Sequence, residues 1–203
     1  MILAIDTSTA ACSAALFERD GDCIAHKDEL IGRGHSERLV PMLDEMLDGR
    51  RADLILVGVG PGSFTGIRVG MAAAQGLAIA WDCELHGMSS IALLAAGAQC
   101  TEPVAAAVEG GHGELFVQQF DGSPIRPQSE LFNLPPSEAA ATVDADLVIG
   151  SAARTLIEAR GRGRAIDGWP SAKDALRLPE ELRTLAPKPV YARAPDARAK
   201  DAA

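Results

Sequence analysis

The alternation of apolar and polar positions at the start of the chain predicts three strands. Residues 2–5 and 12–17 are apolar runs with the length of buried strands. Asp20-Gly21, a hairpin signal, separates the second run from residues 23–28. We therefore expect an antiparallel meander of three strands at the beginning of the fold.

A strand, a tight turn and a long helix are predicted over residues 54–80. Residues 54–59 form an apolar run that breaks at Gly60-Pro61-Gly62. Ser63 and Thr65 then offer side chains that can cap a helix, and no breaker dipeptide follows before Ala80.

Small residues recur along this predicted helix. Gly66, Gly70 and Ala74 are four residues apart and so lie on one face, with Ala73 and Leu77 beside them. Each interior glycine costs roughly 1 kcal/mol of helix propensity relative to alanine, so the stripe predicts a close neighbour. That neighbour is either the core of the chain itself or a helix of another protein, and the pattern alone leaves both open.

A second amphipathic helix is predicted just before residue 50. Ser36 is the expected N-cap, and Leu39, Leu43 and Met46 fall at helical spacing. Pro41 predicts that the helix is kinked there or starts later than Ser36.

The later pattern continues the alternation and predicts eight further elements. They are strands at 83–87, 103–108, 115–120 and 147–149, and helices at 89–98, 137–143, 152–160 and 179–185. The strand and hairpin predicted after Thr101 look like the beginning of a second domain. We therefore expect one domain of residues 1–100, a second of 101–194, and a polar tail of 195–203.

Composition excludes several classes of protein. With 203 residues, 47% of them hydrophobic, the chain can bury a sizeable core. Its net charge of −9 is of the same sign as the phosphates of nucleic acids, so we expect that any binding to RNA requires a partner protein. Residues 1–6 lack a basic leader and residues 69–81 fall short of the ~20 that span a membrane, so we expect a cytoplasmic protein without a membrane segment.

Candidate chemistry is sparse, and no catalytic residue is predicted. Asp6, at the end of the first strand, could hold a metal or activate water, but it is also an ordinary turn former. A glycine-rich turn before a helix can bind phosphate, which makes Asp6, Ser8, Gly60, Gly62, Ser63 and Thr65 a candidate anion or nucleotide loop. The lysine of a phosphate-binding loop is missing there, and the nearby cation is Arg68. The four histidines form no pair at ligand spacing, so no metal site is expected.

An ordered set of motifs in the first half resembles the TsaB (YeaZ) family. The set consists of Asp6-Thr7-Ser8, His35-Ser36-Glu37, residues 60–70 (GPGSFTGIRVG), Gly76-Leu77-Ala78 and Gly87-Met88-Ser89-Ser90. The second half is similar more loosely, through Glu114-Leu115-Phe116 and residues 189–193. Where the family usually has Asp-Ala-Arg, this chain has the loop Glu109 to Glu114 without the arginine.

The resemblance implies a fold and a role. The fold would be α/β, a tandem of two actin-like (ASKHA, RNase H-like) domains with mixed sheets flanked by helices, the second domain reduced. The role would be in forming N6-threonylcarbamoyladenosine at position 37 of tRNAs that read codons starting with A. In that role the chain would be a scaffold or activator without catalysis of its own, bound to the catalytic paralogue TsaD.

The resemblance also implies partners and an interface. A TsaE-type ATPase would join the complex, ATP would be used by the complex, and tRNA would be reached only through it. Separately, one exposed apolar patch on the two helices is expected, and we expect a second copy to cover it in a homodimer when the chain is alone. No cofactor would be bound tightly, and weak nucleotide binding stays open. The expected interface residues, all on the two helices of the first domain, are Leu39, Leu43, Met46, Gly66, Gly70, Ala73, Ala74 and Leu77. The alternatives are a stand-alone nucleotide-dependent phosphotransferase of the same superfamily and a metallopeptidase, against which the lack of ligand pairs argues.

Overall fold

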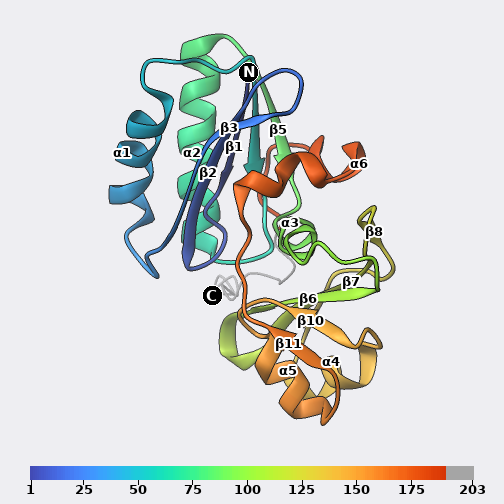
Figure 1. The fold of residues 1–203 in the computed structure, drawn as a ribbon. Helices are drawn as coiled ribbons and strands as arrows, with labels where there is room; N and C mark the ends of the chain where they lie inside the picture. Colours follow the sequence, from blue (N-terminus) through green and yellow to red (C-terminus); the bar gives the residue numbers. More distant parts are fainter. Residues whose placement is uncertain (191–203) are drawn as a thin grey trace, which may run out of the picture.

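The computed structural model describes residues 1–190 and contains two mixed sheets, one above the other (Figure 1). The first sheet has the strand order β3-β2-β1-β4-β5. Its strands are β1 (Ile2–Asp6), β2 (Ala11–Phe17), β3 (Cys23–Leu30), β4 (Leu54–Gly58) and β5 (Glu84–Met88). The first three strands form the predicted antiparallel meander, and β4 and β5 continue the sheet in parallel with β1.

The second sheet repeats this topology in shorter form. Its main order is β11-β10-β6-β7-β8, and β9 also pairs with β7. The strands are β6 (Val104–Glu109), β7 (Leu115–Asp121), β8 (Arg126–Pro127), β9 (Phe132–Leu134), β10 (Leu147–Ile149) and β11 (Arg164–Ile166). Here β6 and β7 are antiparallel, while β10 and β11 add in parallel to β6, as β4 and β5 add to β1. The predicted α/β class with two mixed sheets is confirmed.

Helices flank both sheets, as expected. Helices α1 (His35–Leu47) and α2 (Phe64–Trp81) lie side by side on one face of the first sheet (Figure 1). Helices α4 (Pro136–Thr142) and α5 (Ala153–Arg160) pack together against the second sheet. Helix α5 has 8 residues where its counterpart α2 has 18, which is how the second unit is reduced. No helix within residues 1–190 is both long and apolar enough to cross a membrane.

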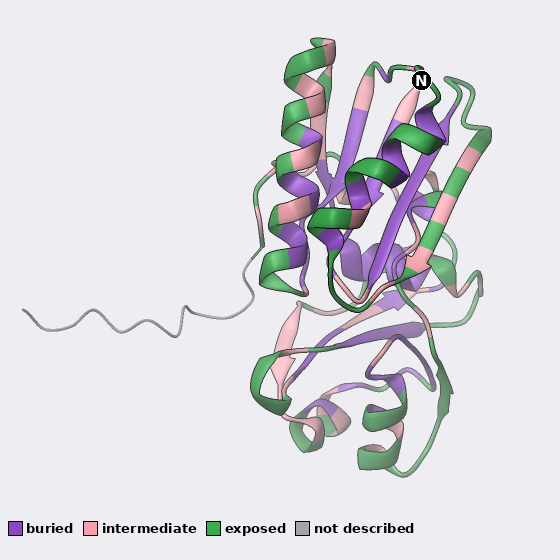
Figure 2. Ribbon diagram, turned by 90° about the vertical axis from the view of Figure 1, so that its left-hand side faces the viewer, coloured by how far each residue is buried: buried purple, intermediate pink, exposed green. Residues whose placement is uncertain are grey.

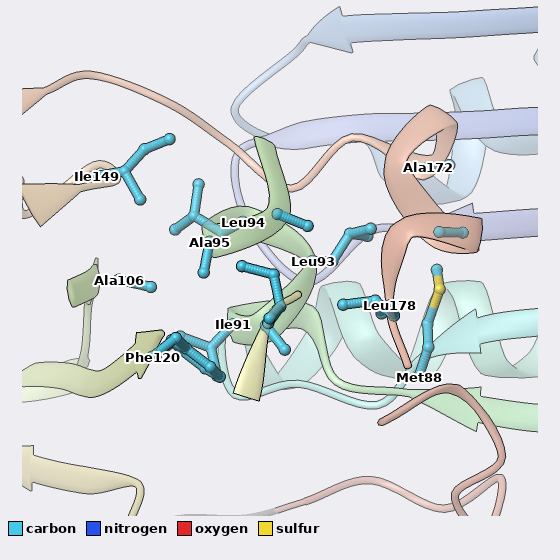
Figure 3. Packing of buried hydrophobic residues seen from close by; sticks show 14 of the residues in the cluster. Met88, Ile91, Leu93, Leu94, Ala95, Ala106, Phe120, Ile149, Ala172 and Leu178 are labelled. Carbon is cyan, nitrogen blue, oxygen red and sulfur yellow. The ribbon is translucent and has the colours of Figure 1, made fainter. Parts of the chain in front are cut away.

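Helix α3 (Ser90–Gly97) joins the two sheets through one core. Ser89 caps it by accepting a hydrogen bond from the Ala92 amide at 3.3 Å. Figure 3 shows its apolar side chains between Phe120, Ala106 and Ile149 of the second sheet and residues that cover the first sheet. Because seven of its eight residues are buried, both halves of the chain share the apolar surface of this helix.

The chain returns to the first sheet after β11. The 3₁₀ helix η2 (Ala172–Arg177) packs on β1, β2, β3 and α3, and the short helix α6 (Glu180–Arg183) lies beside β5. The Ala172 amide donates to Ser13 Oγ at 2.6 Å, and the Val190 amide donates to the Val59 carbonyl at 2.8 Å. The structure does not test the predicted domain boundary near Thr101, which stays a prediction. Residues 191–194 and the predicted tail 195–203 lie outside the described part.

The predicted helices and strands are confirmed, with one wrong cap. Helix α1 begins at His35, and the residue before it is Gly34, with φ 91°, rather than a side-chain cap. Ser36 lies inside the first turn and donates to Glu37 Oε2 at 2.7 Å, so it is not the N-cap. A start later than Ser36 is wrong as well, since the helix runs through Pro41 without a break in its assignment.

Candidate functional site

Helix α2 begins as its sequence predicts. Ser63 has extended backbone angles, and its Oγ accepts a hydrogen bond from the Gly66 amide at 3.2 Å. The Ser63 amide in turn donates to the Ser8 carbonyl at 2.6 Å, which ties the turn to the loop after β1. The position of α2 on the sheet is therefore fixed at its first residues.

The stripe of Gly66, Gly70 and Ala74 faces the core of this chain, not a partner. A Cβ atom at Gly66 would lie 2.1 Å from the Thr7 carbonyl oxygen, and one at Gly70 would lie 2.4 Å from Thr7 Oγ1. Ala74 is fully buried. The expectation that these three residues contact another protein is therefore wrong, because the loop after β1 already occupies the space that they leave.

The other predicted interface residues divide into two groups. Leu39 and Met46 are buried in the core between α1 and the first sheet and cannot reach a partner. Leu43, Ala73 and Leu77 line a groove of about 430 Å³ between α1 and α2, together with Val40, Leu47 and Trp81. The predicted residues of these two helices are therefore divided between the core and the groove, and a partner contact at the groove stays a prediction.

The outer surface of α2 is unusually apolar from Val69 onward. Figure 2 shows exposed positions along both helices, including most of one side of α2. Ile79 is 83% exposed and Val40 is 62% exposed. From Val69 to Trp81 the helix has no charged residue, although Ala72, Gln75, Gly76, Ile79 and Ala80 all face solvent. An uncharged solvent face beside an apolar groove is typical of a protein interaction site.

Asp6 lies at the centre of a buried hydrogen-bond network. Its Oδ1 accepts from the amide and the hydroxyl of Ser8, at 2.9 and 2.7 Å. Its Oδ2 accepts from Ser90 Oγ at 2.6 Å, and the same hydroxyl oxygen accepts from the Gly60 amide at 3.1 Å. Asp6 therefore connects the loop after β1, the turn after β4 and the first residue of α3.

Burial dominates the ionisation of this carboxyl. Asp6 is 1% exposed, and removal from water raises its pKa above the usual 3.8, although the hydrogen bonds from Ser90 and Ser8 act in the opposite direction. A Cβ atom at Gly58 would lie only 2.0 Å from Oδ2, so the neighbouring strand also packs directly on the group. In this arrangement the carboxylate holds three segments together and is not presented to solvent.

The candidate anion loop is assembled but packed on its inner side. Gly62 lies against Ser8, since a Cβ atom there would be 2.0 Å from the Ser8 carbonyl oxygen. Gly60 has φ 99° and is buried, whereas Ser63 and Thr65 are exposed. The structure thus brings together five of the six predicted residues, all except Thr65, which lies in the first turn of α2, and it adds Ser90, which the sequence pattern assigned only to a helix start. Within residues 1–190 no three His, Cys, Asp or Glu side chains form a candidate metal site.

The altered loop between β6 and β7 is a short 3₁₀ turn, η1 (Gly111–Gly113). The Gly110 amide donates to the Glu114 carbonyl at 2.8 Å, and Asn133 Nδ2 on β9 donates to Glu114 Oε2 at 2.5 Å. His112 and Gly113 both have positive φ, 61° and 79°. Glu114 therefore makes these hydrogen bonds within the second half of the chain and links the loop to β9.

Comparisons with known proteins identify relatives of this chain. The model of the family "TsaD: tRNA N6-adenosine threonylcarbamoyltransferase" matches residues 27–125, which include α1 and α2. The tRNA threonylcarbamoyladenosine biosynthesis protein TsaB of Haemophilus influenzae is 38% identical over 133 residues, which are 62% of this chain and 56% of that protein. Its namesake in Escherichia coli strain K12 is 39% identical over 127 residues, 59% of this chain and 54% of that protein. The matched part thus spans about half the length of these curated relatives.

A solved structure extends the likeness over nearly the whole fold. YeaZ from Pseudomonas aeruginosa superposes with a TM-score of 0.79 at 32% identity, covering 94% of this chain and 98% of that one. The likeness therefore includes both sheets and the reduced second unit, which makes the fold the expected actin-like tandem. On this evidence the chain belongs to the TsaB (YeaZ) family.

Proposed function

We propose that this chain is a non-catalytic subunit in the formation of N6-threonylcarbamoyladenosine at position 37 of tRNAs that read codons starting with A. In this role it binds and supports a TsaD-type catalytic subunit through the face formed by α1 and α2. Family membership supports the pathway, and the uncharged stretch of α2 from Val69 to Trp81 supports the mode of action.

The outer face of α2 is the observation that carries the proposal. A surface helix of a monomer normally presents charged residues to water. Here the stretch from Val69 to Trp81 carries none, and it borders the groove lined by Leu43, Ala73 and Leu77. Covering Ile79 and the groove would remove apolar surface from water at roughly 25 cal/mol per Å², a favourable contribution to association.

A catalytic paralogue is the partner that we favour. The TsaD family model matches residues 27–125, so a TsaD-type chain has a counterpart of both helices. Like surfaces can pair about a two-fold or near two-fold axis. We further propose that a second copy of this chain covers the same face when no paralogue is present. A TsaE-type ATPase, ATP and tRNA would then be engaged through the complex.

A stand-alone phosphotransferase has less support. Such an enzyme would use Asp6 and the Gly60 to Thr65 loop toward a bound nucleotide. The Asp6 carboxylate is instead buried and accepts three hydrogen bonds from Ser8 and Ser90. Nucleotide titration of the purified chain, followed by calorimetry, checks this alternative, and turnover by the chain alone would revive it.

The proposed interface can be tested with one charge placed on each half. Ile79→Glu puts a carboxylate on the outer face of α2, and because this side chain is 83% exposed the fold should be retained. Ile166→Glu on β11, 42% exposed, is the matched control on the second sheet. We expect Ile79→Glu to abolish binding to a purified TsaD-type subunit and to shift the free chain from dimer to monomer in sedimentation. Ile166→Glu should leave both unchanged, and equal effects of the two variants would contradict the proposal.

A further inference from the structure

Gly76 is an interior glycine of α2 that the chain itself does not require. A Cβ atom built at Gly66 or Gly70 meets Thr7, which explains both of these glycines. Within residues 1–190, a Cβ atom built at Gly76 meets nothing within 4 Å. Glycine in a helix interior costs roughly 1 kcal/mol relative to alanine, and here no contact within the described part of the chain accounts for that cost.

Gly76 lies directly on the groove between α1 and α2, which the charged residues Asp44, Arg50 and Arg51 also line. Neither Arg51 nor Asp44 takes part in an ion pair within residues 1–190, whereas Arg38 and Glu45 on the other side of α1 are paired with each other. A molecule seated in the groove would therefore meet an apolar floor, a glycine without a side chain, and the Arg51 and Asp44 side chains without an ion pair. It would also meet Arg50, whose guanidinium donates to the Leu47 and Met46 carbonyls.

These charges favour an occupant built like this surface itself. An occupant that satisfies both Arg51 and Asp44 must carry a carboxylate and a cation beside an apolar ridge. The part of the chain matched by the TsaD family model, residues 27–125, contains Asp44, Arg51 and Gly76. A TsaD-type chain therefore has a region related to this one, and a helix of that region is the occupant that we favour.

We infer that a helix of the TsaD-type subunit crosses α2 at Gly76, and that the missing side chain sets how closely the two backbones approach. The inference rests on the proposed function and adds to it the point of closest contact. Distances between packed helices depend on the side chains at the crossing, so a larger residue at this point must push the partner away.

The test separates affinity from stability on one set of variants. Gly76→Ala should raise the melting temperature of the isolated chain by about 2–4 °C, because it gains helix propensity and meets no neighbour. Gly76→Leu should leave the chain folded and weaken binding to the purified TsaD-type subunit by at least about tenfold. Gly70→Ala is the contrasting variant, since it should lower the melting temperature while the folded chain keeps its affinity. Arg51→Ala should weaken binding and reduce its dependence on salt.

Two results would overturn the inference, and they can be told apart. If Gly76→Leu binds as tightly as the wild type while Ile79→Glu does not bind, the partner lies on the face but does not cross at Gly76. If the wild-type chain itself fails to bind the TsaD-type subunit in calorimetry, the proposed function fails and the crossing with it.

Discussion

The hydroxyl group of Thr7 occupies the place where a side chain at residue 70 would begin. The distance between Thr7 Oγ1 and a Cβ atom built at Gly70 would be 2.4 Å, well below the distance of a van der Waals contact. The same hydroxyl donates to the Gly66 carbonyl at 2.7 Å, so it cannot turn away without losing a buried hydrogen bond. This pair explains why α2 can lie so close to the loop after β1.

Gly70→Ala is expected to destabilise the isolated chain. Overpacking of a buried site costs about 1–3 kcal/mol, more than the helix propensity that alanine brings. In a Thr7→Ala background the nearest atom becomes the Cβ of residue 7 at 3.7 Å, an ordinary contact. Urea unfolding should therefore show that the double variant loses less stability than the sum of the losses of the two single variants. Additive effects would mean that Thr7 is not the obstacle.

The Asp6 network should make stability depend on pH in an unusual direction. Burial raises the folded-state pKa of Asp6 above the usual 3.8, so the folded chain binds this proton more tightly than the unfolded chain does. The associated stability is present at low pH and is lost as pH rises through the folded-state pKa. Asp6→Asn does not titrate, so its stability relative to the wild type should increase as pH rises above 3.8, as measured by urea unfolding at several pH values.

Ser90 is expected to be important for stability despite its place at a helix start. Its hydroxyl donates to Asp6 Oδ2 and accepts from the Gly60 amide. Ser90→Ala leaves both buried groups without this partner, which costs about 1–3 kcal/mol for each unsatisfied group. Ser89→Ala, which removes only the N-cap of α3, is the neighbouring control and should cost about 1 kcal/mol. Thermal unfolding of both variants checks that Ser90→Ala loses more stability than Ser89→Ala.

The charged cluster between β3 and α1 should act in the opposite pH direction. Lys27 and Arg38 both donate to Glu45 and lower its pKa to about 2. This contribution is present above the usual pKa of 4.5 and is lost as pH falls through about 2. The difference in stability between the wild type and Glu45→Gln should therefore shrink as pH falls from 4.5 to 2. Molar salt should reduce the difference at neutral pH, because the side chains are partly exposed.

The two halves should unfold together. Trp81 lies on α2 over the first sheet and Trp169 follows β11 of the second, so each half carries one fluorescent reporter. Because the core around α3 contains residues from both sheets, Trp81→Phe and Trp169→Phe variants should report the same denaturant midpoint once corrected for their own stabilities. Two well-separated transitions would show that the shared core does not couple the halves.

Much of this fold could be predicted from local sequence. The Ser63 cap, the Gly161 stop of α5 and the hairpin at Gly21 each act through neighbours a few residues away. Strands β9 and β11 have only 3 residues each, too few for an alternating pattern to be distinguished from a loop.

The structural role of each glycine could not be predicted, because it depends on contacts between segments that are distant in the sequence. Gly70 is small because of Thr7, 63 positions earlier, and Asp6 is held by Ser90, 84 positions later. A periodic pattern shows that a helix face is small but not what lies against it. Gly66 and Gly76 both lie inside α2, but the structure shows that a Cβ atom at the first would meet Thr7 and that one at the second would meet nothing among the described residues.

Helix α3 also bears on how such a chain could arise and change. The two sheets repeat one topology and so resemble a duplicated unit, yet Ile91, Leu94 and their neighbours supply one interior to both. A fragment that ended before β6 would leave one side of this helix in water, and a fragment that began at β6 would lack it altogether. Neither half therefore keeps the packing around α3 without the other.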